Sequence, residues 1–350
     1  MQGFNEELSL PRFFAWIGMF ACGLALLVLG FIFLVDPYKV WRHQATSGFN
    51  ELVLETPTSA QIPLAVLKSA LHKPDMLILG SSRVRRGFNE AQASRLLGGR
   101  VQVIGIDLFP LDMASQLFSA VSKTSVIKRL YLEVNYFTSN SCKRLLDYPA
   151  PEDSGTAALL QLQPGAALSD SIRTLRLNLL GAYPLQSYVD ARGNYHEHLG
   201  KGVDHAELRP GTLDRAFQKI IDNCQQPSAN AADAKSLAQI MQAAQLQGTE
   251  VTLLFLPISP NWHARLRAAG LEQAIAEWKE DLSQQVRHWR SPILDYDQRD
   301  DLLVALPASP DTPVFWDLSH FSMPIGQRLL ADMAQSYGQA RPARSSDIRR

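Results

Sequence analysis

A serine early in the chain, and an aspartate and a histidine near its end, have the residue types and spacing of a serine nucleophile with its base. Ser82 follows the apolar run 76–79 and a turn of small residues. Asp317 lies three residues before His320, so its carboxylate can orient the imidazole from within one short turn. We therefore predict that Ser82 is the nucleophile, that His320 takes its proton, and that Asp317 holds the tautomer of His320.

Each motif also has an interpretation that involves no chemistry. Serine-rich turns commonly follow strands, and a short motif alone matches by chance. Asp317 and His320 could form a capped turn before a helix that we predict at 324–337. The two motifs together favour catalysis, because the carboxyl end of a buried parallel strand is where open α/β sheets place their ligands.

This order, an early serine and a late Asp-x-x-His, resembles that of the SGNH (GDSL-like) hydrolase superfamily. Gly80-Ser81-Ser82-Arg83 stands where Gly-Asp-Ser-Leu is usual. The Gly-Ser-Ser variant behind an N-terminal membrane anchor is similar to the branch that includes D-alanyl-lipoteichoic-acid transfer proteins and cell-surface polysaccharide O-acetylation proteins. The resemblance implies an α/β, flavodoxin-like three-layer fold with about five parallel strands.

The resemblance also implies an oxyanion hole made of the nucleophile N–H, a glycine N–H after the second strand and an asparagine side chain after the third. The matching residues are Ser82, Gly105 and Asn135. Glycine permits a close backbone approach, and an asparagine amide is a neutral donor. The family block reads Gly-x-Asn-Asp, whereas residues 133–136 read Glu-Val-Asn-Tyr. A capping role for Asn135 at the end of its strand is therefore an equal alternative.

Further side chains are candidates for substrate binding. Arg83, Arg85 and Arg86 follow the nucleophile, and their guanidinium groups could hold a phosphate or carboxylate. A solvated loop is the simpler interpretation of these arginines. Trp262 and His263 follow another strand and could line a sugar groove by stacking. His263 is also an alternative base.

Strands alternate with helical stretches, which predicts parallel βαβ units. The predicted strands are 76–79, 101–106, 129–134, 250–256 and 292–296. The predicted helices are 62–72, 90–97, 112–121, 169–180, 231–247, 266–289 and 324–337.

An uncharged apolar run over 13–35 is long enough to cross a bilayer as one helix. It divides a short cytoplasmic tail (1–12) from a linker and helix (36–74). Tyr38 and Trp41 suit the membrane interface. A cleaved signal peptide is the alternative, but the run is longer than a signal core and no clear cleavage motif follows it.

The SGNH-like domain is predicted over 75–338, with an insertion at about 138–230 and a disordered tail at 339–350. We interpret the insertion as a cap over the carboxyl edge of the sheet, or else as a surface cover without function. Cys142 and Cys224 both fall in it. A disulfide between them is possible outside the cytoplasm, although sequence alone does not show that they approach. Cys22 falls in the apolar run.

Composition narrows the functional classes. Hydrophobic residues make up 46% of the 350 residues and charged residues 19%, which is enough apolar material for a large core. The formal net charge is +0, which does not favour a nucleic-acid partner. The cysteine and histidine spacings match no metal motif, and no cofactor is implied.

The leading hypothesis is a membrane-anchored serine O-acyltransferase or esterase of the cell envelope, acting through an acyl-Ser82 intermediate. The resemblance implies an inner-membrane protein with a periplasmic C-terminal domain, a glycan or glycolipid acceptor and a multi-span partner that delivers the acyl group. Arg12 before the run, against Lys39 and Arg42 after it, does not favour this orientation, but long domains translocate largely regardless of charge. The alternatives are a non-catalytic scaffold subunit of a polysaccharide complex and a lipase-like hydrolase.

Overall fold

The computed structural model is described here over most of the chain. The described residues are 10–41, 45–139, 142, 146–181, 187–196, 218–224, 231–297, 299, 301 and 314–340. The predicted tails, most of residues 1–12 and of 339–350, and Arg42 lie outside these residues, as do parts of the insertion.

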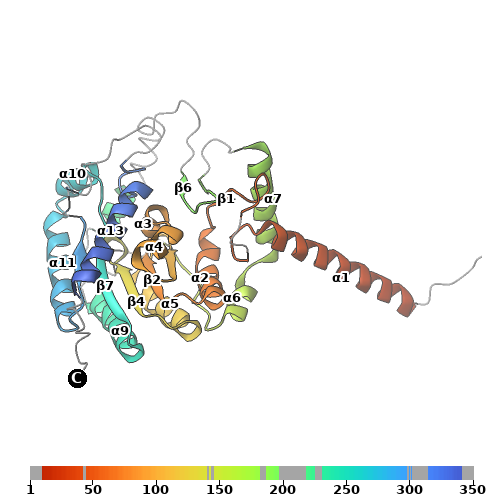
Figure 1. Ribbon diagram of the computed structural model, residues 1–350, viewed down its shortest axis with the longest axis horizontal. Helices are drawn as coiled ribbons and strands as arrows, with labels where there is room; N and C mark the ends of the chain where they lie inside the picture. The colour runs from red at the N-terminus through yellow and green to blue at the C-terminus, as the bar shows by residue number, and fades with distance from the viewer. Residues whose placement is uncertain are drawn as a thin grey trace, which may run out of the picture.

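A five-stranded parallel sheet forms the centre of the protein (Figure 1). Its strand order is β3-β2-β4-β7-β8. The strands are β2 (Met76–Gly80), β3 (Val101–Gly105), β4 (Arg129–Glu133), β7 (Glu250–Phe255) and β8 (Ile293–Asp295). Each falls on a predicted strand, because near-continuous apolar runs are what a sheet buried on both faces requires.

Helices cover both faces of this sheet. Alternate residues of each strand enter different hydrophobic clusters, so Leu77 and Leu79 pack on one face and Met76 and Ile78 on the other. The first face carries α2 (Thr58–His72), α5 (Leu111–Thr124), α9 (Ala231–Gln247) and α11 (Glu272–Arg287). The second carries α3 (Ser82–Gly87), α4 (Glu90–Leu97) and α13 (Met323–Ala340).

The single helix predicted over 266–289 is wrong, because the structure has two helices in this region. These are α10 (Pro260–Ala268) and α11, with the chain turning between them at Gly270. Gly270 has a φ of +72°, a left-handed conformation that ends a helix and that glycine adopts without steric cost. The break allows Leu266 and Leu271 to enter one small apolar cluster with Trp262.

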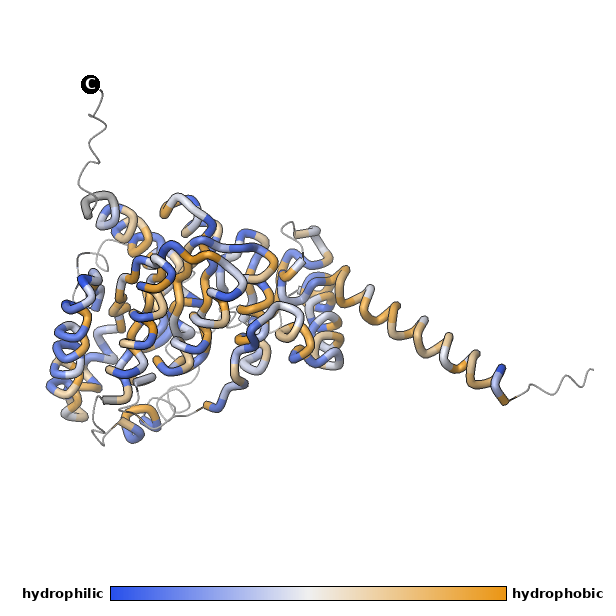
Figure 2. The backbone as a smooth tube through the Cα atoms, turned by 90° about the horizontal axis from the view of Figure 1, so that it is seen from below, coloured by the Kyte–Doolittle hydropathy of each residue, from blue (hydrophilic) through white to orange (hydrophobic). Residues whose placement is uncertain are grey.

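The helix α1 (Leu10–Val35) is long and apolar enough to cross a membrane. It projects from the body of the protein, and Figure 2 shows apolar residues along most of its length. None of its most apolar window is buried against the rest of the chain. Its 26 residues would span about 39 Å at the α-helical rise, which exceeds the hydrocarbon thickness of a bilayer.

The carboxyl end of α1 is fixed to the folded body. Val35 and Asp36 are buried, and Asn50 donates to the Val35 carbonyl at 3.0 Å. The Asp36 carboxylate accepts from the backbone N–H groups of Val40 and Trp41 at 2.7 and 2.9 Å. The segment that follows α1, part of the predicted linker, is therefore structured.

The described part of the insertion includes two helices and a β-hairpin. The helices α6 (Gly155–Gln161) and α7 (Pro164–Leu180) pack against α2 and α1, respectively. The strands β5 (Tyr188–Val189) and β6 (Tyr195–His196) form a hairpin beside β1 (Val53–Leu54). A turn joins β5 to β6, and β6 contacts α3 at the carboxyl edge of the main sheet.

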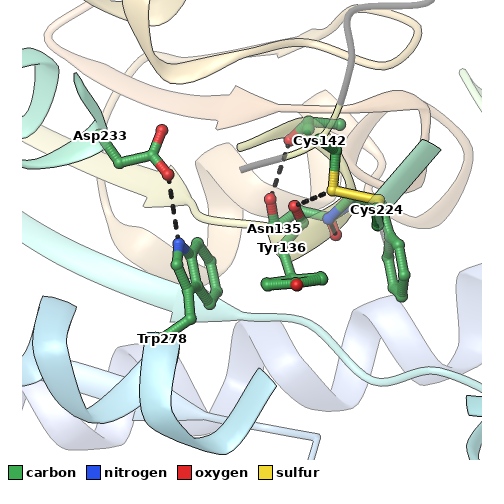
Figure 3. Close-up of a disulfide and its surroundings, with 8 residues drawn as sticks. Asn135, Tyr136, Cys142, Cys224, Asp233 and Trp278 are labelled. Atoms are coloured by element: carbon green, nitrogen blue, oxygen red, sulfur yellow. Dashed lines mark hydrogen bonds between the residues drawn. A yellow bond between two sulfur atoms is a disulfide. The ribbon is translucent and has the colours of Figure 1, made fainter. Parts of the chain in front are cut away.

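A disulfide joins Cys142 and Cys224, and so closes a loop between residues 82 positions apart (Figure 3). Cys142 lies just after the 3₁₀ helix η1 (Tyr136–Thr138), and Cys224 ends the helical residues 218–224. Both side chains belong to the main hydrophobic cluster. The sequence left this pairing open, because only the fold brings the two Cα atoms to 4.3 Å.

We expect loss of this disulfide to lower the free energy of unfolding. Cys142→Ser should cost about 2–5 kcal/mol, because a closed loop of this length restricts the unfolded chain. Urea unfolding of the full chain in detergent measures the change, and the reduced wild type should match the variant. Cys22→Ser, in the exposed α1 helix, is the control and should unfold as the wild type does. Equal unfolding of the reduced and oxidised wild type would contradict the prediction.

Candidate active site

Ser82, His320 and Asp317 form a continuous hydrogen-bonded chain. Ser82 Oγ lies 2.7 Å from His320 Nε2, and His320 Nδ1 lies 2.6 Å from Asp317 Oδ2. The Ser82–His320 contact joins residues 238 positions apart. Ser82 and His320 are partly exposed, so a substrate can reach both side chains. The structure therefore brings together the three residues that the sequence singled out, in the order serine, histidine, carboxylate that a nucleophile and its base require.

The Asp317 carboxylate is fixed by its own loop. Its Oδ1 accepts from the backbone N–H groups of Ser319 and His320 at 2.7 and 2.9 Å. Burial of Asp317 opposes ionisation, but the charge of His320 and these hydrogen bonds outweigh it and hold the pKa of the carboxyl well below its usual value. Asp317 is thus an anion at neutral pH, as the stabilisation of an imidazolium requires.

The loop that carries Asp317 and His320 is closed on itself and attached to α3. Phe315 and Phe321 form a β-bridge, and the Trp316 N–H donates to the His320 carbonyl at 2.8 Å. Phe321 is fully buried and packs edge-on against Phe88. Gly87 accommodates the Phe321 ring because it has no Cβ to occupy the same space. This packing sets where His320 lies relative to the helix that begins at Ser82.

Ser82 is the first residue of α3 and directly follows the turn at the end of β2. Ser81 caps the helix, with its hydroxyl accepting from the Arg83 N–H. The N–H of a first helical residue has no partner within its helix. The Ser82 N–H makes no hydrogen bond with another described residue, which leaves it free to donate to an oxyanion.

A buried ion pair that the sequence did not reveal lies beneath this turn. Glu133 Oε1 pairs with Arg83 Nη2 at 2.6 Å, and their side chains are 1% and 7% exposed. Glu133 also accepts from the Ser81 N–H at 2.6 Å and the Ser81 hydroxyl at 2.9 Å. Arg83 donates in addition to the Leu256 carbonyl at 3.1 Å. The pair thus joins the ends of β2, β4 and β7 under the nucleophile.

This position of Arg83 corrects the prediction that its guanidinium group faces a substrate. The guanidinium group points into the protein and is committed to Glu133 and Leu256. Gly80 makes room for the same pair, because a Cβ there would overlap the Glu133 side chain. Glu133, paired with Arg83, therefore acts as a brace for the serine turn.

Asn135 has the capping role that was one of the two alternatives from the sequence, and its role as an oxyanion donor stays a prediction. Its Oδ1 accepts from the Phe137 N–H at 3.1 Å and caps η1 after β4. Among the described residues no partner is recorded for its Nδ2, and the side chain is partly exposed. Because β4 is the neighbour of β2 in the sheet, capping orients a free amide donor at the same edge as Ser82.

Gly105 lies at that edge as well, paired with Gly80 across β2 and β3. A Cβ at Gly105 would overlap the backbone of α3 at Arg85, and the Gly105 carbonyl accepts from Arg85 Nη1 at 3.0 Å. Helix packing is thus sufficient reason for a glycine at this position. A role as an oxyanion donor stays a prediction.

The remaining arginines after the nucleophile have carboxylate partners. Arg85 bonds Glu55 and Asp107, and Arg86 bonds Glu55 at 3.3 Å. Arg86 also lies 4.0 Å from Asp317 Oδ2 and 5.1 Å from the centre of the Tyr195 ring. Of the predicted arginines, Arg86 alone therefore reaches the triad, where its charge supports the ionised state of Asp317.

Trp262 and His263 do not form an open stacking surface. Trp262 is 1% exposed and packs against Phe137, so the sugar stacking predicted for it is wrong. His263 Nε2 lies 3.1 Å from Asp297 Oδ1, within ion-pair distance, and Asp297 also pairs with Lys279 at 2.8 Å. His263 thus has its own carboxylate partner, whereas His320 is the histidine that contacts Ser82.

Comparisons with known proteins add no identification. No family model matches the chain, and no match was found among the curated proteins. Within the described ranges, no group of three or more histidine, cysteine and carboxylate side chains is arranged to hold a metal ion.

Removing the buried brace should destabilise the protein strongly. Glu133→Gln leaves the Arg83 charge buried without its counter-ion, which should cost about 3–5 kcal/mol in the free energy of unfolding. Glu250→Gln is the matched control, since Glu250 is 59% exposed and lies 3.8 Å from Arg129. A surface pair of this kind should contribute about 0–1 kcal/mol. Urea unfolding in detergent compares the two variants, and similar losses for both would refute the brace.

The His263–Asp297 contact predicts a pH-dependent contribution to stability. The contact with Asp297 raises the pKa of His263 above its usual 6.5. Burial by itself would raise the pKa of Asp297, but the interactions with His263 and Lys279 outweigh burial and lower this pKa to about 2. The contribution of ionised Asp297 to the free energy of unfolding is complete above about pH 4 and is lost as the pH falls towards its folded pKa. The contribution of protonated His263 to the free energy of unfolding is complete below about pH 6.5 and is lost as the pH rises through its raised pKa.

The difference in unfolding free energy between the wild type and Asp297→Asn should therefore be largest between about pH 4 and 6.5. It should fall only in part above that window, because Lys279 stays charged and paired. Unfolding curves of both proteins across the pH range measure this difference. A difference that grows between pH 6.5 and 8 would be incompatible with a protonated His263 in this contact.

Proposed function

We propose that the protein is a membrane-anchored serine O-acyltransferase or esterase that acts through an acyl-Ser82 intermediate. The observation that carries this proposal is the hydrogen-bonded chain from Ser82 through His320 to Asp317, with distances of 2.7 and 2.6 Å. Its first two members are reachable from solvent, and its last is an anion held by its own loop.

The proposed reaction has two acyl transfers. In the first, Ser82 Oγ attacks the carbonyl carbon of an acyl donor while its proton passes to His320 Nε2. The tetrahedral intermediate collapses, the leaving group takes that proton, and an ester on Ser82 remains. In the second, His320 removes the proton of an acceptor hydroxyl or of water, which attacks the ester and releases Ser82 with its proton restored.

Two donors support stabilisation of the oxyanion. The Ser82 N–H and the Asn135 amide lie at the carboxyl ends of neighbouring strands, and no partner among the described residues is recorded for either. Neutral donors fixed before the reaction are worth several kcal/mol to such an intermediate. Gly105 would be a third donor in this proposal.

Relationship to the SGNH superfamily is part of the same proposal. Numbered along the main sheet, the strand order is 2-1-3-4-5, as in flavodoxin-like folds. In that order the connections reverse direction between the first and third strands, here β2 and β4. Ser82 and Asn135 follow those two strands, which is where such sheets bind ligands.

The membrane helix favours transfer over hydrolysis and suggests the substrate. An anchored enzyme stays near a multi-span partner that delivers acyl groups, and we propose a glycan or glycolipid as acceptor and acetyl as the acyl group. A disulfide is stable in an oxidising compartment, so Cys142–Cys224 supports a periplasmic or other extracytoplasmic domain.

A fluorophosphonate probe tests the proposal, because it reacts covalently with activated serines. We expect the full chain in detergent to be labelled, and Ser82→Ala and His320→Ala to lose labelling. Ser47→Ala is the control, since the Ser47 hydroxyl is exposed and bonded to Glu51 away from these residues; it should retain labelling. Asp317→Asn should label at least about 100-fold more slowly, because loss of the carboxylate leaves the wrong histidine tautomer.

A folded wild type that does not react, or label that remains on Ser82→Ala, would refute a catalytic Ser82 and favour a scaffold subunit. Circular dichroism of each variant separates loss of reactivity from loss of fold. Labelled wild type can then be assayed for loss of acetyl transfer to envelope glycans, which distinguishes a transferase from an esterase.

A further inference from the structure

We propose that the outer face of α6 and α7 is a second membrane-binding surface that rests on anionic lipid headgroups beside α1. This face consists of five exposed apolar residues, and we refer to it as the leucine face: Leu159, Leu160, Ile172, Leu179 and Leu180. The proposal relies on α1 as the membrane anchor and does not depend on the chemistry of Ser82.

The leucine face is unusually exposed for large apolar side chains. Leu160, Leu179 and Leu180 are 82%, 65% and 71% exposed, and Leu159 and Ile172 are 41% and 47% exposed. Groups of exposed apolar side chains on soluble surfaces mark sites that bind a protein, a ligand or a membrane. The opposite side of α7 is buried through residues such as Ala167, Thr174 and Leu177. The helix therefore has apolar residues on its exposed side as well as on its buried side.

The position of the face identifies a bilayer as its occupant. α7 packs against α1, and Figure 1 shows α6 and α7 at the end of the body from which α1 projects. Tyr38, just after α1, donates to Asp170 of α7 at 2.8 Å, which fixes the two helices to one another. A membrane crossed by α1 would therefore begin next to the leucine face.

An apolar cavity of about 350 Å³ continues from the membrane helix to α6. Leu29 and Phe33 of α1 and Trp41 line one part of it, and Leu159 and Leu162 line another. The apolar lining is thus shared between the candidate span and the proposed surface. Lipid tails beside α1 would therefore contact apolar side chains of both α1 and α6, as expected at the surface of a bilayer.

The charges of α7 favour anionic lipids. Arg173 and Arg176 lie on its exposed side, between the apolar residues of the leucine face. The one acidic residue of α7, Asp170, is buried, accepts from Tyr38 and pairs with Arg173 at 3.3 Å, so Arg176 supplies the net positive charge of the helix. The sequence of α6 contains no charged residue. Leucines interleaved with arginines are typical of helices that lie in the interface of a membrane.

Site-directed spin labelling of the full chain tests this surface. Nitroxides at Leu160→Cys and Leu180→Cys, in a Cys22→Ser background, are examined in liposomes of neutral and anionic phospholipids. Oxygen concentrates in lipid and a nickel chelate in water, so we expect the ratio of their collision rates to be several-fold higher at both sites than at a control. The control is Leu246→Cys, which is 87% exposed on α9.

Arginine variants test the attraction of α7 to anionic lipid headgroups. Arg173→Gln with Arg176→Gln should lower the collision ratio at residues 160 and 180 in anionic liposomes to its value in neutral ones. Ratios at these residues equal to that of residue 246 would overturn the proposal, because the face would then be in water. Shielding from both reagents would also overturn it, since a protein rather than lipid would cover the face. Serine labelling is measured separately, so failure of either proposal leaves the other standing.

Discussion

The buried ion pair between Arg83 and Glu133 is the interaction on which the site depends. Placing two charges out of water is unfavourable unless their hydrogen bonds are satisfied, and here both groups have additional partners. Those partners are Ser81 and Leu256, so satisfying the pair fixes the end of β2 against β4 and β7. Ser82 is the next residue after Ser81, so the pair also determines where the Ser82 side chain points. The brace also accounts for Gly80, which leaves space for the carboxylate.

A second constraint joins the two halves of the triad. Ser82 and His320 come from distant parts of the chain, and the sheet alone does not set their distance to a fraction of an ångström. Contact between Phe321 and Gly87 does so, because the ring of one occupies the space that the other leaves empty. The aromatic ring follows His320 directly and the glycine ends the helix that begins at Ser82. Packing at one end of α3 thus positions the chemistry at the other.

Local patterns predicted the strands, α1 and the triad, because each depends on residue type and spacing within a short window. The Glu133 brace was missed because no local pattern links a glutamate to an arginine 50 positions away. The substrate contacts predicted for Arg83 and Trp262 are wrong for the same reason. Charge and aromaticity suggest contact with a ligand, but residues distant in the sequence bury both side chains. The pairing of Cys142 with Cys224 required the fold. The break at Gly270, by contrast, has a local signal in the sequence, a glycine within the helical pattern.

The junction after α1 determines how the sheet lies relative to a membrane. A flexible linker would let the domain rotate freely about its anchor. Here Asp36 caps the following turn, Asn50 holds the last carbonyl of α1, and Tyr38 bonds α7. The direction of α1 is therefore transmitted to the body, and contact of α7 with lipid would remove the remaining freedom to tilt. The carboxyl edge of the sheet would then be held at one height above the bilayer, which suits the acyl transfer that we propose.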